Sequence, residues 1–201
     1  MLPDAVRLLM TTPEGDVAVE LRVPGRHNVA NALAATAASV AAGATLEDVR
    51  FGLGGFAGVA GRLRMSRSPR GARIIDDSYN ANPGSLGAAL EVLAGFEGET
   101  TAVLGDMLEL GAGEIELHAE AGRRARELGV NRLLCIGELS VHSARAFGPG
   151  ATHMASVEAL CDALATHTGA GDVVLVKGSR GMRMERVVQF LEQLGRADGK
   201  E

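Results

Sequence analysis

Residues 72–95, ARIIDDSYNANPGSLGAALEVLAG, carry the clearest indication of the fold class. Its apolar start at 72–75 predicts a short buried strand. Asn82 followed by Pro83 is the pattern of a helix N-cap with proline at the first helical position, and Gly95 marks the end of that helix. The stretch therefore predicts a strand, a polar loop and a helix in succession.

The same strand–helix unit recurs along the rest of the chain. Further apolar runs occupy residues 101–104, 132–136 and 172–176, with a weaker one at 152–155. Helical patterns lie between and after them, at 114–128, 140–147, 156–166 and 182–194. This alternation predicts βαβ units, and the uninterrupted Val/Ile/Leu runs favour parallel strands buried on both faces. We expect an α/β fold with a Rossmann-like, mostly parallel sheet and helices on both faces.

The first 61 residues have a different pattern. Residues 6–23 alternate around Pro13-Glu14-Gly15, which predicts a hairpin. Small residues at 28–42 and a capping pattern at Thr45 predict two helices, the second at 46–53. The glycine-rich stretch GGFAGVAG (54–61) predicts a linker or hinge. We expect one domain at 1–61 and another at 62–201.

Composition excludes several classes of protein. The chain has 201 residues, 46% of them hydrophobic and 22% charged, which argues against disorder. The formal net charge of -5 predicts no nucleic-acid partner. The chain has neither an apolar run of about 18 residues nor a signal-peptide pattern, so we expect no membrane insertion and a cytoplasmic location.

The cysteines and histidines predict no metal centre. Cys135 and Cys161 lie in apolar surroundings, which favours buried free thiols over a disulfide or a metal pair. Four histidines lie outside the predicted N-terminal helix, and their spacing is not that of metal ligands. They are His118, His142, His153 and His167.

Polar residues and glycines follow the predicted strands. These segments are DDSYNANP (76–83), GDMLE (105–109), GE (137–138) and KGSRG (177–181). Ligands of open α/β sheets bind outside the carboxyl ends of the strands, so we expect these segments to share one edge. An acidic pair such as Asp76-Asp77 can simply solvate a strand end, but the long polar run after it favours function. The cations and glycines of KGSRGMR (177–183), ahead of a helix, favour an anion site.

Five motifs together resemble the Mur ligase family. In family order they are GRHNVANALAA (25–35), GRL (61–63), DDSYNANP (76–83), GDMLELG (105–111) and VKGSRGMRME (176–185). The last three are similar to the branch that adds D-alanyl-D-alanine to UDP-MurNAc-tripeptide in peptidoglycan precursor synthesis. The resemblance implies an ATP-dependent ligase that works through an acyl phosphate, with ATP and Mg²⁺ as cofactors.

The resemblance also implies roles for residues at the motif positions. The residues implied to bind ATP are His27, Asn28, Asn31, Arg62 and Asp77. Among them, Arg62 is the implied catalytic residue, since a guanidinium stabilises charge that develops in phosphoryl transfer. The residues implied to bind the dipeptide or the substrate carboxylate are Tyr79, Asn80, Asn82, Lys177, Ser179 and Arg180.

One departure from the family pattern limits what the resemblance implies. The chain has no GxxGK[ST] phosphate-binding loop. We therefore interpret residues 1–61 as the C-terminal end of the central ATP-binding domain and 62–201 as the C-terminal Rossmann-like domain of the family. The magnesium ligands are expected elsewhere in the ligase, and the isolated chain is predicted to be inactive. Its alanine-rich helix predicts packing on the second domain or self-association through residues 1–61.

Two other functions remain open at this stage. One is another Mur-type ligase, such as the muramyl-peptide or folylpolyglutamate type, although DDSYNANP and GDMLELG do not favour it. The other is a non-catalytic nucleotide-binding module with a Rossmann-like fold. The chain lacks GxGxxG after a first strand, which disfavours a dinucleotide dehydrogenase.

Overall fold

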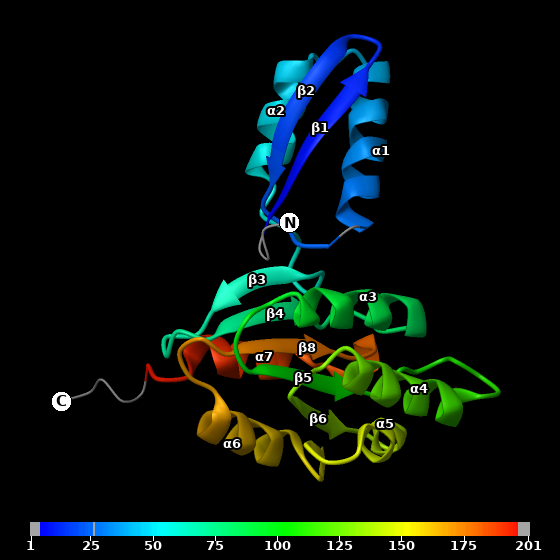
Figure 1. The fold of residues 1–201 in the computed structure, drawn as a ribbon, viewed down its shortest axis with the longest axis vertical. Coiled ribbons are helices and arrows are strands. Elements are labelled where there is room, and N and C mark those ends of the chain that lie inside the picture. The colour runs from blue at the N-terminus through cyan, green and yellow to red at the C-terminus, as the bar shows by residue number, and fades with distance from the viewer. Residues whose placement is uncertain (1–4, 26, 197–201) are drawn as a thin grey trace. The chain divides into compact units, whose positions relative to one another are not determined.

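The computed structural model describes residues 5–25 and 27–196, and only the backbone of His27. The chain divides into two compact units between Val59 and Ala60, within the glycine-rich stretch 54–61 (Figure 1). Each unit is described by itself.

The first unit contains a hairpin and two helices. Strands β1 (Val6–Thr12) and β2 (Gly15–Leu21) pair antiparallel, and Gly15 has a φ of 122° that favours glycine at the turn. Helices α1 (His27–Ala41) and α2 (Leu46–Gly55) follow. Alternate hairpin side chains, among them Val17 and Val19, form a small core with the helices. The predicted hairpin and both predicted helices are confirmed.

Local capping sets the starts of two helices where the sequence predicts them. The Thr45 side chain accepts a hydrogen bond from the Asp48 N–H, and the Asp48 carboxylate accepts one from the Thr45 N–H. Asn82 and Ser85 form the same reciprocal pair at the start of the next helix. Each pair satisfies backbone donors that a helix start leaves without partners.

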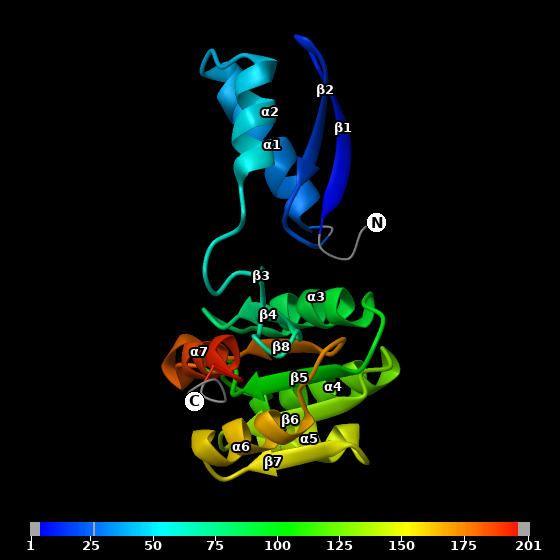
Figure 2. The same cartoon turned by 90° about the vertical axis from the view of Figure 1, so that its left-hand side faces the viewer.

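The second unit is built on one six-stranded sheet. Its strands are β3 (Arg64–Arg67), β4 (Arg73–Asp77), β5 (Thr100–Gly105), β6 (Arg132–Ile136), β7 (Ala151–Met154) and β8 (Val173–Lys177). Their order is β3-β4-β8-β5-β6-β7, which Figure 2 shows from β3 down to β7. Only β3 runs antiparallel to its neighbour. The predicted mostly parallel α/β sheet is confirmed.

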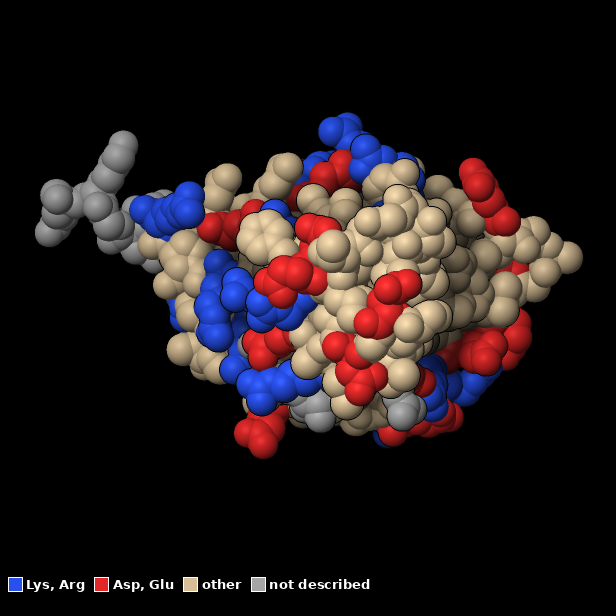
Figure 3. Space-filling view, turned by 90° about the horizontal axis from the view of Figure 1, so that it is seen from above, with Lys and Arg blue, Asp and Glu red and all other residues tan. Residues whose placement is uncertain are grey.

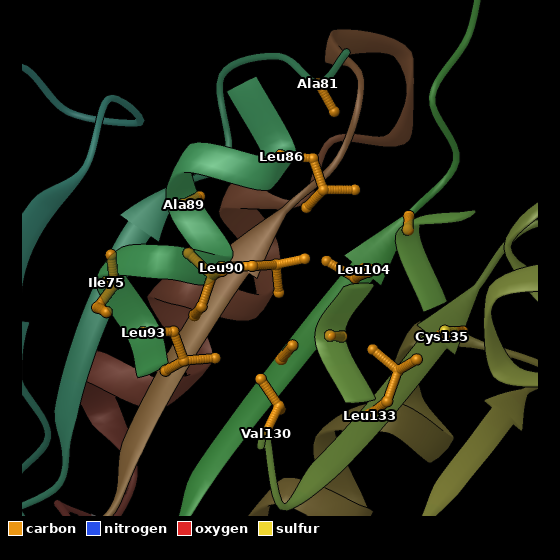
Figure 4. Packing of buried hydrophobic residues seen from close by; sticks show 14 of the residues in the cluster. Ile75, Ala81, Leu86, Ala89, Leu90, Leu93, Leu104, Val130, Leu133 and Cys135 are labelled. Carbon is orange, nitrogen blue, oxygen red and sulfur yellow. The ribbon is translucent and has the colours of Figure 1, made fainter. Parts of the chain in front are cut away.

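Helices cover both faces of this sheet. They are α3 (Pro83–Ala94), α4 (Glu114–Glu127), α5 (Ser140–Phe147), α6 (Val157–His167) and α7 (Glu185–Gln193). The first three pack with Ile75 and its face of the sheet, and the last two pack with Ile74 on the other. Figure 4 shows Leu86 and Leu90 of α3 pointing toward Leu104 of β5. Burial of one leucine side chain contributes about 1.5–3 kcal/mol.

Two elements differ from the sequence prediction. The sequence does not predict strand β3, because RMSR (64–67) has no alternation of apolar and polar residues. A strand at the edge of a sheet forms without a strong apolar pattern of its own. The predicted helix at 182–194 is wrong at its start. A short 3₁₀ turn covers Arg180–Met182, Arg183 has a left-handed φ of 52°, and α7 begins only at Glu185.

The connections create a switch point at β8. Strand β8 lies between β4 and β5 and leads to α7 on one face, whereas β4 and β5 lead to α3 and α4 on the other face. The chain leaves these neighbouring strands toward opposite faces, and in open α/β sheets ligands bind outside the carboxyl ends of the strands at such a point. The polar segments after these three strands are therefore brought to one edge.

Three further structural observations bear on the expectations from composition. Among residues 5–25 and 27–196, the helices lack the length and apolar composition of a membrane span. The face drawn in Figure 3 carries both basic and acidic side chains among uncharged ones.

Both cysteines are free, but only Cys135 is fully buried, and Cys161 is half-buried. Burial raises the pKa of the Cys135 thiol to about 12, so this thiol is a poor nucleophile.

Replacing Gly122 by alanine is expected to destabilise the second unit by about 1–3 kcal/mol through overpacking. Helices α4 and α5 approach so closely there that an added Cβ would lie 2.0 Å from the Ser143 carbonyl oxygen. Gly87 of α3 is the matched control, because a Cβ there meets nothing within 4 Å. Gly87→Ala should leave stability unchanged or raise it by up to about 1 kcal/mol. Urea unfolding measures both, and equal midpoints for the two variants would contradict the close packing.

Candidate functional site

A buried ion pair joins the ends of β4 and β8. Asp77 and Lys177 are neighbours in the parallel ladder, and the Lys177 ammonium donates to the Asp77 carboxylate. The same ammonium donates to the Asn80 carbonyl oxygen at 2.8 Å. Lys177 is only 2% exposed. The predicted contact of Lys177 with a substrate stays a prediction, and its charge is already paired inside the protein.

The two aspartates after β4 hold the GRL segment in place. The Asp76 carboxylate accepts the Gly61 N–H at 2.8 Å, and the Asp77 carboxylate accepts the Leu63 N–H at 3.1 Å. Leu63 has a left-handed φ of 51°, a conformation that these hydrogen bonds help to maintain. Arg62 therefore stands between two anchored residues.

Tyr79 contacts two guanidinium groups. The Cζ atom of Arg62 lies 4.6 Å from the centre of the Tyr79 ring, and that of Arg180 lies 5.5 Å from it. Cation–π contacts at exposed sites are worth about 0.5–1 kcal/mol each. Within the described part of the chain, neither guanidinium has an ion-pair partner. Both arginines are exposed, so the edge presents two cations to solvent.

Ser179 ties the segment after β8 to the segment after β5. Its N–H donates to the Asp106 carbonyl oxygen at 2.9 Å, and its Oγ accepts the Leu108 N–H at 2.7 Å. Ser179 is buried, so its role in the structure is to connect two loops. Its predicted contact with substrate stays a prediction.

Two side chains, one of them within the segment, connect the GDMLELG segment to helices α5 and α4. The carboxylate of Asp106 accepts the Leu139 and Ser140 N–H groups at the start of α5. The His118 Nε2 accepts the Met107 N–H at 2.9 Å, so the proton is assigned to Nδ1, which donates to the Glu114 carbonyl oxygen. No signal in the sequence predicts this use of His118, because its partners are backbone groups.

The two asparagines of DDSYNANP serve the local backbone. The Asn82 carboxamide oxygen caps α3 by accepting the Ser85 N–H at 2.9 Å. The Asn80 carboxamide oxygen accepts the Ala81 N–H at 2.9 Å. Both side chains lie in exposed parts of the loop, and their predicted contact with a dipeptide stays untested.

The remaining predicted nucleotide-binding residues belong to the first unit. His27 begins α1, and its side chain lies outside the described residues. The Asn28 side chain donates to the Pro24 carbonyl oxygen at 2.6 Å. Asn31 is exposed and donates to the Asn28 side-chain oxygen at 3.1 Å. These amides bond to each other and to the segment before α1, and their contact with ATP stays a prediction.

The arrangement at the sheet edge is suited to binding an anion. Arg62 and Arg180 offer guanidinium donors without a competing carboxylate, because Asp76 and Asp77 accept from protein donors. The Asp77 carboxylate is paired with the Lys177 ammonium, and this neighbouring positive charge disfavours a magnesium ion there. No cluster of three or more His, Cys, Asp or Glu side chains that could hold a metal ion occurs in the described ranges.

Comparisons with known proteins match this chain over most of its length. The profile of the family "Mur ligase, glutamate ligase domain" matches residues 61–180. A UDP-N-acetylmuramoyl-tripeptide–D-alanyl-D-alanine ligase of Escherichia coli is 43% identical over 188 residues, which are 92% of this chain and 41% of that protein. The chain thus spans about two fifths of the length of this relative.

Solved structures agree in fold. A crystal structure of MurF from Acinetobacter baumannii has a TM-score of 0.86 and 34% identity, covering 96% of this chain and 43% of the other. MurF ligase from Thermotoga maritima in complex with ADP has a TM-score of 0.84 and 27% identity, covering 96% of this chain and 45% of the other. Since the profile covers more than half of the residues, the chain belongs to the Mur ligase family.

Proposed function

We propose that the chain is part of an ATP-dependent ligase that joins D-alanyl-D-alanine to UDP-MurNAc-tripeptide. The names of the similar proteins support this substrate pair, and the ADP complex of one of them supports a nucleotide. The observation that carries the proposal is Arg62, which is exposed, unpaired within the described residues and anchored on both sides by the Asp76 and Asp77 carboxylates.

ATP supplies the phosphoryl group that activates the substrate carboxylate. Arg62 donates to phosphate oxygens and stabilises the negative charge that develops on them. The hydrogen bonds at Gly61 and Leu63 limit the backbone motion of Arg62, so the guanidinium needs little reorganisation.

Asp77 combines two roles in this proposal. Its carboxylate holds Leu63 and pairs with Lys177, and its side chain is still 12% exposed. Each carboxylate oxygen has two lone pairs, so the exposed part accepts a ribose hydroxyl of the nucleotide. Lys177 then acts by fixing the orientation of Asp77.

The two units take the domain roles that the family resemblance implies. Residues 1–61 supply the end of the central ATP-binding domain, with His27, Asn28 and Asn31 toward the nucleotide. Residues 62–201 supply the C-terminal domain, with Asn80, Asn82 and Ser179 toward the peptide substrates. Magnesium is proposed to take its ligands from residues other than the carboxylates of this sheet edge.

Self-association through residues 1–61 also stays a prediction. In the first unit, Leu33 is 49% exposed and Phe51 is 84% exposed. Burial of these apolar side chains against a second copy of the chain would favour association.

A chimera tests the proposed function. This chain replaces the matching C-terminal part of the Escherichia coli relative, and addition of D-alanyl-D-alanine to UDP-MurNAc-tripeptide is measured with ATP and magnesium. We expect turnover in the chimera and none with the chain alone. Arg62→Ala should lower the turnover number by about a thousandfold or more, as for other arginines that stabilise phosphoryl transfer.

The control is Arg123→Ala on α4, an exposed arginine paired with Glu116, which should leave turnover unchanged. A folded chimera that accepts another amine but not D-alanyl-D-alanine would favour a different Mur-type ligase. A chain that binds NAD tightly would favour the non-catalytic nucleotide-binding module.

A further inference from the structure

We propose that Tyr79 is a positioning residue that holds Arg62 and Arg180 together as one binding site for a phosphate-bearing anion. The site itself follows from the geometry, and its assignment to the terminal phosphates of a nucleotide rests on the proposed function. The inference adds Tyr79 and Arg180 to a site in which only Arg62 is assigned to phosphate.

The first argument is the shared ring. With distances of 4.6 Å and 5.5 Å to one ring centre, the two guanidinium carbons lie within about 10 Å of each other, comparable with the Debye length at 0.1 M salt. Two cations this close repel, and the negative face of the tyrosine ring offsets part of the repulsion. An oligophosphate that contacts both guanidinium groups neutralises the repulsion that remains between them.

The second argument is that the backbone brings all three residues together. The Tyr79 N–H donates to the Gly61 carbonyl oxygen at 3.0 Å, which places Tyr79 beside the GRL segment. Arg180 directly follows Ser179, whose N–H and Oγ are both bonded to the segment after β5. The three side chains therefore stand on anchored backbone.

The third argument is the close approach at Gly61. Its φ is 76°, and a Cβ there would lie 2.9 Å from the Cβ of Tyr79. Only glycine permits this approach without a shift of Tyr79. Glycine at this position is what lets the ring lie against the segment that carries Arg62.

The fourth argument is the lack of competition for the two guanidinium groups. The nearby carboxylates of Asp76 and Asp77 accept from Gly61, Leu63 and Lys177. In contrast, Arg64, Arg123 and Arg124 of the same unit have glutamate partners. Arg62 and Arg180, without such partners in the described ranges, are free to bind an external anion.

The experiment measures binding of inorganic pyrophosphate to the 201-residue chain by calorimetry at low salt. We expect Arg62→Ala and Arg180→Ala each to weaken binding about tenfold, as for loss of one charge-assisted donor. The double variant should lose less than the product of the two effects, because the anion contacts both groups at once. Arg123→Ala serves as the charge-matched control and should change affinity less than about twofold.

Tyr79 is tested with two variants. Tyr79→Phe keeps the ring and should bind pyrophosphate as the wild type does, whereas Tyr79→Leu should weaken binding about threefold or more. Circular dichroism checks that both variants are folded. The readout separates positioning from a structural role, since loss of the hydroxyl is tolerated and loss of the ring is not.

Several results would overturn the proposal. These are no measurable pyrophosphate binding, equal losses for Arg123→Ala and Arg62→Ala, or full affinity in Tyr79→Leu. Acetate that displaces pyrophosphate as well as inorganic phosphate does would assign the site to a carboxylate instead. An inactive chimera with intact pyrophosphate binding would overturn the proposed ligase function and leave this anion site standing.

Discussion

Replacing Lys177 by methionine is expected to lower the free energy of unfolding of the second unit by about 3–5 kcal/mol. The ammonium is 2% exposed and donates to Asp77 and to the Asn80 carbonyl oxygen. Its removal leaves the Asp77 carboxylate with an uncompensated charge at a site where its side chain is only 12% exposed. Loss of one partner of a buried pair is more damaging than loss of both, because the other charge then stays desolvated.

The measurement is urea unfolding followed by tyrosine fluorescence. The chain has one tyrosine and no tryptophan, and Tyr79 lies in the second unit beside the ion pair, so the signal reports that unit. The double variant Lys177→Met with Asp77→Asn should recover much of the lost stability.

Arg123→Met, at an exposed pair with Glu116, is the control and should change stability by less than about 0.5 kcal/mol. A Lys177→Met chain as stable as the wild type would show that the pair is not desolvated as the structure places it.

Replacing Asp106 by alanine should cost about 1–3 kcal/mol for each backbone donor that it leaves without a partner. The carboxylate accepts the Ser140 N–H at 2.7 Å and the Leu139 N–H at 3.1 Å, and it lies at the N-terminus of α5, where negative charge is favourable. Gly137 shows how tight this contact is, because a Cβ there would lie 2.3 Å from the Asp106 Oδ1.

Asp106→Asn is the conservative comparison, since both N–H groups bond to Oδ1 and a carboxamide oxygen at that position still accepts them without the negative charge. Its loss of stability should be clearly smaller than that of Asp106→Ala in the same urea titration. Hydrogen exchange at Leu139 and Ser140 gives a second readout, and protection in the alanine variant equal to the wild type would contradict the capping role.

The helices and strands could largely be predicted because their signals are local. A capping pair such as Asn82 with Ser85 lies within one turn of helix, and an apolar run such as 173–176 is buried wherever the sheet forms. Strand β3 escaped prediction because its pairing with β4, and not its own composition, makes it a strand. The start of α7 escaped because Arg183 adopts a left-handed conformation that no local signal requires.

The sheet edge that carries the candidate site could be predicted from the sequence, but the contacts between its side chains could not. The expectation that the polar segments after the strands share one sheet edge is confirmed, since the carboxyl ends of parallel strands meet there. Which side chain pairs with which was not predictable. Lys177 pairs with Asp77, a residue 100 positions away. The family resemblance implies instead that Asp77 binds ATP and that Lys177 binds the dipeptide or the substrate carboxylate.

The family motifs, the α/β class and the sheet edge that carries the polar side chains can all be inferred from the amino-acid sequence. The anchoring of the GRL segment by Asp76 and Asp77 is seen only in the folded chain. The same holds for the contacts of Arg62 and Arg180 with Tyr79. These contacts depend on the strand order. Insertion of β8 between β4 and β5 brings distant segments into contact, and the partner of each charge is set by that long-range arrangement.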